Sequence, residues 1–533
     1  MAILTYIPWL TFLSLLTISY ASNECLSTKT RTLSGKCTST LNPVLGEARR
    51  ALFSYYDVDS RHPDTKNLKS AREISNLISS QSGNTKNSMH LNELFTFFGQ
   101  FIDHDFGLTP FAKPAVHMDI PVTQDDPILS SSHLSFSRSE RAKVNDSTDV
   151  ERPITVLSSA LDLSGVYGVD EERNSFLRSP HSCRLRTSKK NLLPFNTQRF
   201  VNVPSVSPIF FIAGDTRANE TPMLTAMHTI WVREHNRICD HLEDAFTNYS
   251  IDKQYEVARA INIAQFQKIV YEEWLPAILG AKLPRYKGYD ENVNPTVSVE
   301  FTTAAFRLGH TLVGDGVSRI GRNGNRLPTK PAHEMFFEPG AQFTSRGMED
   351  FIRGAAGTLA QEVDEKVVDT LRNFLFENVE EEEGFDLVAL NLQRSRDHNV
   401  ARFNKLREVF LGSSARSFAD ITRNTRIQKK LRQAYGSVEN VEAWTGLMAE
   451  DKNRGVGVGR TLEGMLKTEF GRLRDGDQFF YLRKNQIPDE VLQEFPGMQR
   501  DIYNSRPLFN RILLRNTRIS SVSLPRGANA FRN

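Results

Sequence analysis

The segment GQFIDHDFGLTP, from Gly99 to Pro110, places Asp103, His104 and Asp105 in an unbroken row within a run of large apolar residues. On a helix, successive side chains point about 100° apart, so the three polar groups face different directions. A lone buried His needs only a bond to a backbone carbonyl. Burying a carboxylate costs several kcal/mol, however, unless it is paired, bound to metal or consumed chemically. The row therefore indicates a site with a partner for each side chain.

The same segment is predicted to be helical. Apolar residues between Leu91 and Ile102 share one broad face, and Gly107 followed by Pro110 provides a stop. Helical spacing recurs along the chain, whereas alternating strand patterns are scarce. We expect helices in the windows 91–102, 223–238, 257–279, 299–312 and 367–376. No repeat or low-complexity linker divides the chain, so the predicted fold is mainly α, in a single large helical domain.

The composition is that of an ordinary globular protein. Of the 533 residues, 39% are hydrophobic and 24% are charged, which excludes a disordered or fibrous chain. The net charge of +3, from 66 basic and 63 acidic residues, is too small to favour nucleic acid as a partner. The acidic run Glu380–Glu383 suits a cation site or a solvated loop, and runs of this kind favour the loop.

The N-terminal stretch MAILTYIPWLTFLSLLTISY is apolar and uncharged, and Ala21 and Ser22 follow it. This pattern predicts a secretory signal peptide over residues 1–21, a mature chain over residues 22–533 and an extracellular location. The alternative is a retained membrane anchor, because about 20 apolar residues can also span a bilayer.

Cysteines and glycosylation sequons fit a secreted glycoprotein. The chain has only four cysteines: Cys25 and Cys37 are close enough to form a disulfide, whereas Cys183 and Cys239 either pair or stay as buried thiols. The sequons lie at Asn145, Asn219 and Asn248. We expect no glycan at Asn219, because its neighbours look functional.

A second candidate segment, FIAGDTRANETP, runs from Phe211 to Pro222 and leads into an apolar helical stretch. Arg217 and Glu220 lie three residues apart beside the expected helix start. A surface ion pair explains that spacing equally well, so this segment alone gives weak support for a site.

Two further segments combine polar side chains with an apolar helix. In FRLGHTLVGDG, His310 shares a face with Phe306, and a neutral imidazole in that setting can bind iron through one ring nitrogen while the other donates to a fixed acceptor. In LVALNLQRSRDHN, Asn391 is suited to be that acceptor. Arg394 and Arg396 follow, and both are candidates to meet anionic propionates.

Taken together, eight collinear segments resemble the animal haem peroxidases over nearly the whole mature chain. They are RTLSGKC (31–37), LKSAREISN (68–76), LDLSGVYG (161–168), AGDTRANE (213–220), MHTIWVREHNR (227–237), FRLGHTL (306–312), LNLQRSRDH (390–398) and LRDGDQF (473–479). The resemblance implies the fold of that family, in which one large helical domain surrounds a buried haem.

Matched to the family residue by residue, every polar group of the opening segment gains a role. His104 matches the distal histidine, Asp103 an aspartate esterified to a haem methyl group, and Asp105 a ligand of the structural calcium. Gln100 matches the distal glutamine, and Arg217 the catalytic distal arginine.

The remaining matches complete the cofactor sites. Glu220 matches the second ester-forming carboxylate, which implies a haem b derivative ester-linked through Asp103 and Glu220. His310 matches the proximal iron ligand and Asn391 its hydrogen-bond partner, and Arg394 is expected to bind haem.

The family's calcium loop matches LSSALDLSGVYG. It implies oxygen ligands at Ser158, Ala160 (through its carbonyl), Asp162 and Ser164, with Asp105 joining from the distal helix. Ligation by oxygen alone suits a hard cation such as calcium.

The implied function is that of a secreted haem peroxidase, an oxidoreductase that reduces hydrogen peroxide and oxidises an organic donor or a (pseudo)halide through a ferryl haem. Neutral His104 would carry a proton from one peroxide oxygen to the other, and Arg217 would stabilise charge as the O–O bond breaks. The expected partners are hydrogen peroxide and a small electron donor, with no nucleic acid and no stable membrane insertion after signal cleavage. Donor identity and oligomeric state stay open.

Several departures from the family limit these expectations. Thr221 stands where some members have a methionine that forms a sulfonium link to haem, so we expect only the two ester bonds and a weaker capacity to oxidise chloride. Ser158 replaces a threonine but keeps a hydroxyl. The family's disulfide before AGDTR is missing, because Pro208–Phe211 reads PIFF. No immunoglobulin-like, EGF-like or leucine-rich segment precedes the peroxidase region, and no RGD or KGD motif supports integrin adhesion.

Two other functions compete with the peroxidase. One is a secreted adhesion or matrix protein with a vestigial haem site, which the intact distal and proximal residues disfavour. The other is a fatty-acid oxygenase that uses a tyrosyl radical beside the proximal histidine, which the absence of tyrosine from FRLGHTLVG disfavours.

Overall fold

The computed structural model describes residues 24–56, 59–338, 347–375, 384–525 and 529–533. Helices dominate these residues and pack on one continuous hydrophobic core, which confirms the mainly α prediction. The α-helices are α2 (Ala71–Ile78), α3 (Glu93–Phe106), α4 (Ser164–Tyr167), α5 (Glu171–Leu177), α6 (Pro222–Ala245), α7 (Ile251–Ile269), α8 (Leu275–Leu279), α9 (Gly309–Leu312), α11 (Glu349–Gly357), α12 (Asp369–Arg372), α13 (Leu387–Asp397), α14 (Phe403–Leu411), α15 (Thr425–Tyr435), α16 (Ala443–Ala449), α17 (Arg460–Asp475), α18 (Asp489–Glu494), α19 (Pro496–Tyr503) and α20 (Phe509–Asn516).

The strands are short and antiparallel. A three-stranded sheet has the order β1-β5-β4, with Arg50 opposite Thr155 and Arg141 opposite Pro153. The strands are β1 (Arg50–Ala51), β2 (Ile120–Pro121), β3 (His133–Leu134), β4 (Arg141–Lys143), β5 (Glu151–Thr155), β6 (Gly316–Val317) and β7 (Lys330–Pro331). The Thr155 hydroxyl donates to the Phe106 carbonyl at 3.0 Å, so β5 holds the C-terminal end of α3.

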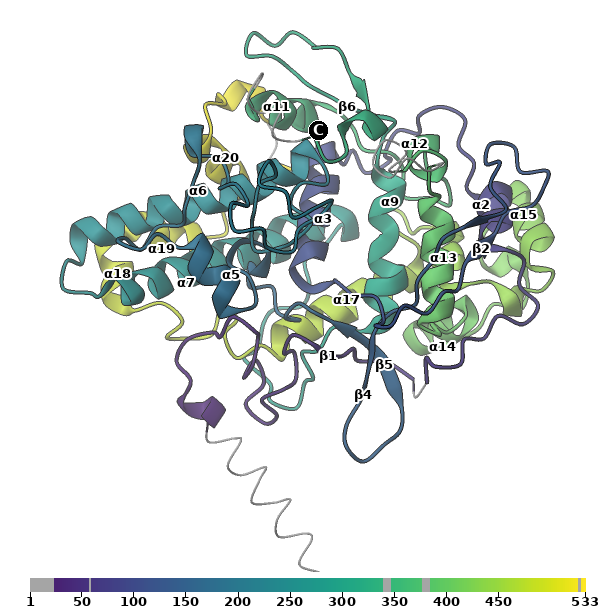
Figure 1. Cartoon of the computed structure of the whole chain (residues 1–533), viewed down its shortest axis with the longest axis horizontal. Helices are drawn as coiled ribbons and strands as arrows, with labels where there is room; N and C mark the ends of the chain where they lie inside the picture. The colour runs from purple at the N-terminus through teal and green to yellow at the C-terminus, as the bar shows by residue number, and fades with distance from the viewer. Residues whose placement is uncertain (1–23, 57–58, 339–346, 376–383, 526–528) are drawn as a thin grey trace, which may run out of the picture.

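Helix α3 carries the opening segment and lies near the centre of the molecule, between the helices around α6 and α7 on the left and those around α13 and α2 on the right (Figure 1). Asn92 caps its first turn by accepting a hydrogen bond from the Phe95 N–H, and Gly107 follows its last residue. Phe98 and Phe101 are buried against the core. The helix predicted from apolar spacing is therefore confirmed, and it continues through His104.

Helix α6 confirms the second predicted window and explains one departure from the family. Thr221 is its N-cap: the hydroxyl accepts a hydrogen bond from the Leu224 N–H at 3.1 Å, and Pro222 opens the first turn. The threonine at this position therefore stabilises the N-terminus of α6.

The windows 257–279 and 299–312 are helical but irregular. Between α7 and α8, the residues Val270–Trp274 form a π-helical turn, η2. A second π-helical turn, η3 (Phe301–Ala305), leads through the 3₁₀ turn η4 (Phe306–Leu308) into α9. Such turns are frequent at functional sites, and His310 follows directly.

The prediction of a helix over 367–376 is wrong for most of its length. Only Asp369–Arg372 is helical, because Val367 bridges to Ser80 and Leu375 bridges to Phe385. Residue 376 and the acidic run Glu380–Glu383 lie outside the described residues.

No helix in the described part of the chain is long and apolar enough to cross a membrane. The predicted signal peptide, residues 1–21, lies outside the described residues.

Candidate active site

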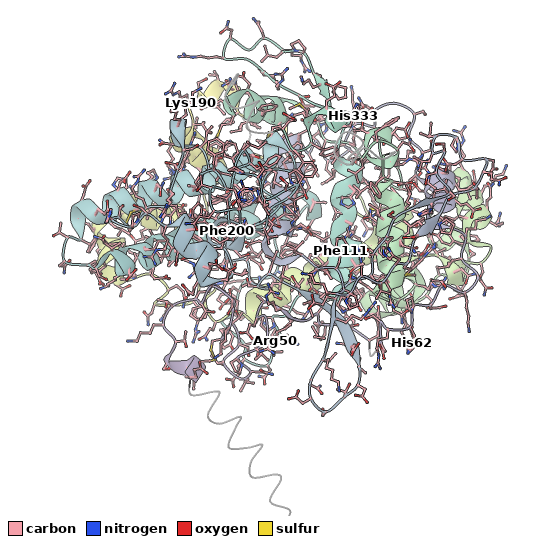
Figure 2. The ribbon with its side chains drawn as sticks, in the orientation of Figure 1. Arg50, His62, Phe111, Lys190, Phe200 and His333 are labelled. Atoms are coloured by element: carbon pink, nitrogen blue, oxygen red, sulfur yellow. A yellow bond between two sulfur atoms is a disulfide. The ribbon has the colours of Figure 1, made fainter. Side chains whose placement is uncertain are left out.

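A cavity of about 410 Å³ lies between α3, the segment before α6 and the segment that carries His310. Its size is within the range of small-molecule and cofactor sites, about 300–1,000 Å³. It is lined by the predicted residues Gln100, Asp103, His104, Arg217, Glu220, His310 and Arg394. Phe111, labelled in Figure 2, also lines the cavity and is 58% exposed, which places it at the mouth.

The opening row divides as the helical geometry predicts. Asp103 and His104 line the cavity, whereas Asp105 faces the loop before α4. Burial raises the pKa of Asp103 to about 6, although Arg217 opposes the shift. Neighbouring residues of one helix thus reach two different sites.

One wall of the cavity holds an amide, an imidazole and a carboxyl group. Gln100 Nε2 donates to Glu220 Oε2 at 3.0 Å, and His104 Nε2 lies 3.8 Å from the same oxygen. Burial raises the pKa of Glu220 to about 7, so its carboxyl group is poised between its two protonation states at neutral pH.

Asp215, which sequence reasoning did not single out, holds Arg217. Arg217 Nε and Nη2 donate to its two carboxylate oxygens at 2.9 and 2.8 Å, and Arg217 Nη1 donates to the Gly107 carbonyl at 2.9 Å. His104 Nδ1 lies 3.8 Å from Asp215 Oδ1. The Asp-x-Arg spacing of AGDTR was the available signal.

The imidazole of His104 is kept neutral by its surroundings. Burial lowers its pKa well below the ordinary value, and the charge of Arg217 lowers it further. Its Nδ1 is buried without a hydrogen-bond partner. A neutral imidazole has one unprotonated ring nitrogen, so His104 can accept a proton from a ligand in the cavity.

His310 also lines the cavity and contacts Asn391, which lies outside the lining. Asn391 Nδ2 lies 2.8 Å from His310 Nδ1, and Arg307 Nη1 donates to Asn391 Oδ1 at 2.9 Å. Burial lowers the pKa of His310 to about 3, with a further contribution from Arg307, so the ring is neutral. Arg307 also lines the cavity and was missed, although it stands three residues before His310.

The two arginines after Asn391 point to different places. Arg394 lines the cavity and donates to Asp397 at 3.0 Å. Arg138 and Arg141, from the segment around β4, donate to the same carboxylate at 2.6 and 2.7 Å. Three arginines around one carboxylate leave a net positive charge beside this part of the cavity, although Arg394 alone of the three lines it. Burial lowers the pKa of Arg394 to about 10, which leaves it charged at neutral pH.

The hypothesis that Arg396 also meets propionates is wrong. Its Nε donates to Glu442 at 2.8 Å, and it lines a different, smaller pocket. Positions two apart on a helix are separated by about 200°, so Arg394 and Arg396 face opposite sides of α13.

The predicted calcium loop folds around Asp105. Asp105 Oδ2 accepts hydrogen bonds from the backbone N–H groups of Asp162 and Leu163, and the Ser164 hydroxyl donates to the Asp105 carbonyl at 2.8 Å. Ser158 Oγ donates to Asp162 Oδ2 at 2.7 Å. Burial raises the pKa of Asp105 well above its ordinary value, and the charge of Asp162 raises it further. Two buried carboxylates with oxygen-rich surroundings are the donor type that a hard cation such as calcium prefers. Ala160 is buried in the same loop.

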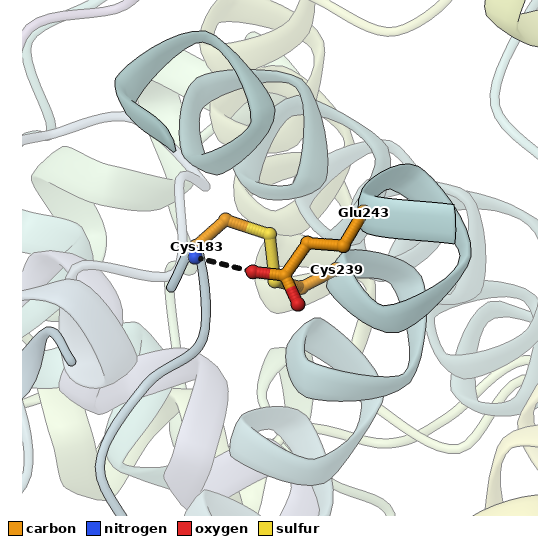
Figure 3. A group of neighbouring side chains, drawn as sticks. All are labelled: Cys183, Cys239 and Glu243. Carbon is orange, nitrogen blue, oxygen red and sulfur yellow. Dashed lines mark hydrogen bonds between the residues drawn. A yellow bond between two sulfur atoms is a disulfide. The ribbon is translucent and has the colours of Figure 1, made fainter. Parts of the chain in front are cut away.

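Both cysteine pairs form disulfides, Cys25–Cys37 and Cys183–Cys239. Glu243 lies beside the second pair and accepts a hydrogen bond from the Cys183 N–H at 3.1 Å (Figure 3). These three residues resemble a metal-ligand cluster, but sulfurs joined in a disulfide are not thiolate ligands.

Comparison with known proteins fits this geometry. A sequence model of the family described as animal haem peroxidase matches residues 30–525. The chain belongs to the animal haem peroxidase family. It is 32% identical over 430 residues to peroxinectin A of Dictyostelium discoideum, covering 77% of this chain and 80% of that protein. It is 30% identical over 561 residues to mouse myeloperoxidase, covering 93% and 76%.

Solved structures agree. Peroxidase A from Dictyostelium discoideum superposes with a TM-score of 0.84 at 29% identity, covering 95% of this chain and all of that one. A fatty acid alpha-dioxygenase from Oryza sativa reaches 0.82 at 18% identity, covering 99% and 93%, which shows a shared fold alone. The chain is therefore a haem peroxidase, an oxidoreductase of this family.

The cavity fits the haem of an animal haem peroxidase. A side chain added at Gly309, next to His310, would meet no atom within 4 Å, so that wall stays open. Arg307 and Arg394 offer positive charge to propionates, and the neutral rings of His104 and His310 both line the cavity.

Glu93, the first residue of α3, is an acid without an ion-pair partner in the lining of the same cavity. It lines the cavity, its Oε2 is buried without a hydrogen-bond partner, and burial raises its pKa to about 8. Because the pKa of Glu93 is higher in the folded protein than its unfolded value of 4.5, the folded state favours the protonated acid. The contribution of Glu93 to the unfolding free energy is therefore complete below pH 4.5 and is lost as the pH rises toward 8.

We expect Glu93→Gln to remove most of this pH dependence. The wild type should lose about 3–5 kcal/mol of unfolding free energy between pH 4.5 and 8 relative to the variant, because Gln cannot ionise. Urea unfolding of the haem-free protein across this range measures the difference. If the unfolding free energies of the two proteins changed in parallel with pH, ionisation of Glu93 would not destabilise the folded protein.

Proposed function

We propose that this protein is a secreted peroxidase that reduces hydrogen peroxide and oxidises a phenol, another small organic donor or a (pseudo)halide. The observation that carries the proposal is the single cavity that Gln100, His104, Arg217 and His310 line together. When bound, haem would supply the redox chemistry, held by His310 as the iron ligand. Residues 1–21 are proposed to direct secretion.

The residues of the chain divide the work. Neutral His104 takes a proton from one peroxide oxygen through a ring nitrogen and returns it to the other. Arg217, fixed by Asp215, stabilises negative charge as the bond between the oxygens lengthens. Gln100 and Glu220 complete the polar wall at 3.0 Å from each other.

The proximal side sets the state of His310. For Nε2 to bind iron, Nδ1 must carry the proton, so Asn391 must present Oδ1 to it. A half-turn of the amide achieves this and releases Arg307 for a propionate. We further propose ester links through Asp103 and Glu220, and calcium held by the Asp105 loop.

The sequons add a smaller proposal. Asn145 and Asn248 are exposed and suited to carry glycans, whereas Asn219 is buried and its side-chain amide bonds the Phe211 backbone at 2.8 and 3.0 Å.

The experiment is a turnover assay with the haem-loaded chain, hydrogen peroxide and guaiacol as the phenolic donor. We expect peroxide-dependent oxidation. A haem-replete protein that binds cells strongly but turns over no donor would instead support the adhesion function, and consumption of linoleate under oxygen would support the oxygenase.

A further inference from the structure

A chain of aromatic residues, here called the file, leads from the cavity toward the protein surface through Trp274, Phe470, Tyr271, Phe480 and Tyr481. Trp274 lines the cavity, and its ring lies 3.0 Å from the point where a side chain at Gly99, next to Gln100, would begin. It stacks on Phe95 with ring centroids 4.7 Å apart, and its indole N–H donates to the Phe95 carbonyl at 3.0 Å. An oxidisable indole therefore stands in the wall, held in one orientation.

The next oxidisable side chain is Tyr271, in the same π-helical turn η2. Phe470 packs between the two rings, 6.1 Å from Trp274 and 6.0 Å from Tyr271. Beyond Tyr271, Phe480 lies 5.2 Å away and in turn contacts Tyr481 at 4.7 Å. Oxidisable rings thus alternate with phenylalanines along the file.

Tyr481 has a proton acceptor. Its hydroxyl donates to Glu272 Oε1 at 2.9 Å, and Glu272 is partly exposed and paired with Lys282 at 3.4 Å. A phenol that loses an electron becomes a strong acid, so a carboxylate on its hydroxyl lets the proton leave and return along one hydrogen bond. Tyr271 lacks such a base, because its hydroxyl donates to the Phe470 carbonyl.

The file ends at the surface. Tyr503, the last residue of α19, is 44% exposed. The segment that carries Tyr503 packs beside the file, because Lys268 of α7, just before η2, donates to the carbonyl of Asn504, the residue after Tyr503. In keeping with this packing, burial and Glu272 raise the pKa of Tyr481 well above its ordinary value, and the phenols of Tyr271 and Tyr503 add to the rise. Aromatic contacts are common in protein cores, but core packing requires neither a carboxylate on Tyr481 nor an exposed end.

We propose that Trp274, Tyr271, Tyr481 and Tyr503 form an electron relay through which this protein oxidises phenols too large to enter the cavity, such as tyrosine side chains of other proteins. The proposal rests on the proposed peroxidase function, which supplies the oxidant. Reduction of hydrogen peroxide to water leaves the cavity two electrons short. Electron tunnelling falls steeply with distance, so closely spaced oxidisable rings carry charge farther than one step would.

The step balances one electron at a time. An electron passes from Tyr481 through Tyr271 and Trp274 to the cavity, while the Tyr481 proton moves to Glu272. Tyr503 then gives Tyr481 an electron and releases its own proton to water, while Glu272 returns the proton to Tyr481. The docked phenol gives an electron and a proton to Tyr503, and the cavity takes up one proton from water for each electron that it receives. Two phenols and one hydrogen peroxide yield two phenoxyl radicals and two waters.

The test compares wild type, Tyr481→Phe and Tyr503→Phe, each haem-loaded, on free guaiacol and on tyramine coupled to high-molecular-weight dextran. We expect kcat/KM for the dextran donor to fall about tenfold in both variants, with guaiacol turnover within about twofold of wild type. Electron paramagnetic resonance after peroxide addition should show a tyrosyl signal in wild type that is lost in Tyr481→Phe, and spin-trap adducts should map to Tyr481 and Tyr503.

Tyr249→Phe is the matched control. Tyr249 also donates to a carboxylate, Glu490, at 2.6 Å, but its described ring neighbours Phe246 and, beyond it, Phe495 do not line the cavity. It should behave as wild type. Wild-type dextran turnover and an unchanged radical signal in Tyr481→Phe would overturn the relay while leaving the peroxidase intact. Failure of wild type on both donors would overturn the proposed function itself.

Discussion

Replacing His104 by Ala should slow the reaction of the haem-loaded protein with hydrogen peroxide by about 10²–10⁴-fold, the usual contribution of a positioned general base. The ring is neutral and lines the cavity. No nearby group can replace it as a base in the haem-loaded protein, because Arg217 stays protonated, Gln100 has no basic atom, and Asp103 and Glu220 are the carboxyl groups that we propose to be esterified to haem. Stopped-flow spectroscopy at the haem band measures this single step.

His241→Ala is the control for this prediction. His241 is exposed, packs against Phe495 and lies outside the cavity, so its loss should leave the peroxide rate unchanged. Both variants should bind haem, because neither change removes His310. A near-normal peroxide rate in His104→Ala would remove His104 from the proton transfer.

Asp105→Asn should lower the unfolding free energy when calcium is present but not when calcium is removed. With calcium at about 100 times its dissociation constant, the wild type should gain about 3 kcal/mol of unfolding free energy, and the variant much less. In chelator, the variant should be at least as stable as wild type, because it removes one of two buried carboxylates that repel each other.

The pH dependence of the metal-free wild type gives an independent reading. Burial raises the pKa of Asp105 and of Asp162 in the folded protein. Their contribution to the unfolding free energy is therefore complete at low pH, where both are protonated, and is lost as the pH rises through their folded-state pKa values. Calorimetry in chelator and in calcium measures both effects, with the exposed Asp244→Asn as a control for charge alone. If chelator left wild type and Asp105→Asn equally stable, calcium would have no place in this loop.

Local spacing predicted the parts of the structure that depend on one element. The apolar face of α3, its stop at Gly107 and the divergence of Asp103, His104 and Asp105 all follow from the helical period. The same period also separates Arg394 from Arg396, so the error about Arg396 was avoidable from the sequence.

Other features depend on partners distant in the chain. The window 367–376 failed because its apolar residues bridge to Ser80 and Phe385, which outweighs helical spacing. The pairing of Cys183 with Cys239 joins positions 56 residues apart, and neither composition nor spacing decides such a pairing. The sequence around Glu93 gives no sign of its role, because that role depends on the cavity, which the carboxyl group lines without a hydrogen-bond partner for its Oε2.

The Cys183–Cys239 disulfide matters beyond its own neighbourhood. It ties Cys183, in the segment after α5, to the C-terminal half of α6, and the 56-residue loop that it closes contains Asp215, Arg217 and Glu220. Closing a loop of this length removes about 4 kcal/mol of chain entropy from the unfolded state. Reduction would thus loosen the arginine end of the cavity before it disturbs α3. For heterologous production, the oxidising power of the host compartment becomes a determinant of specific activity as well as of yield.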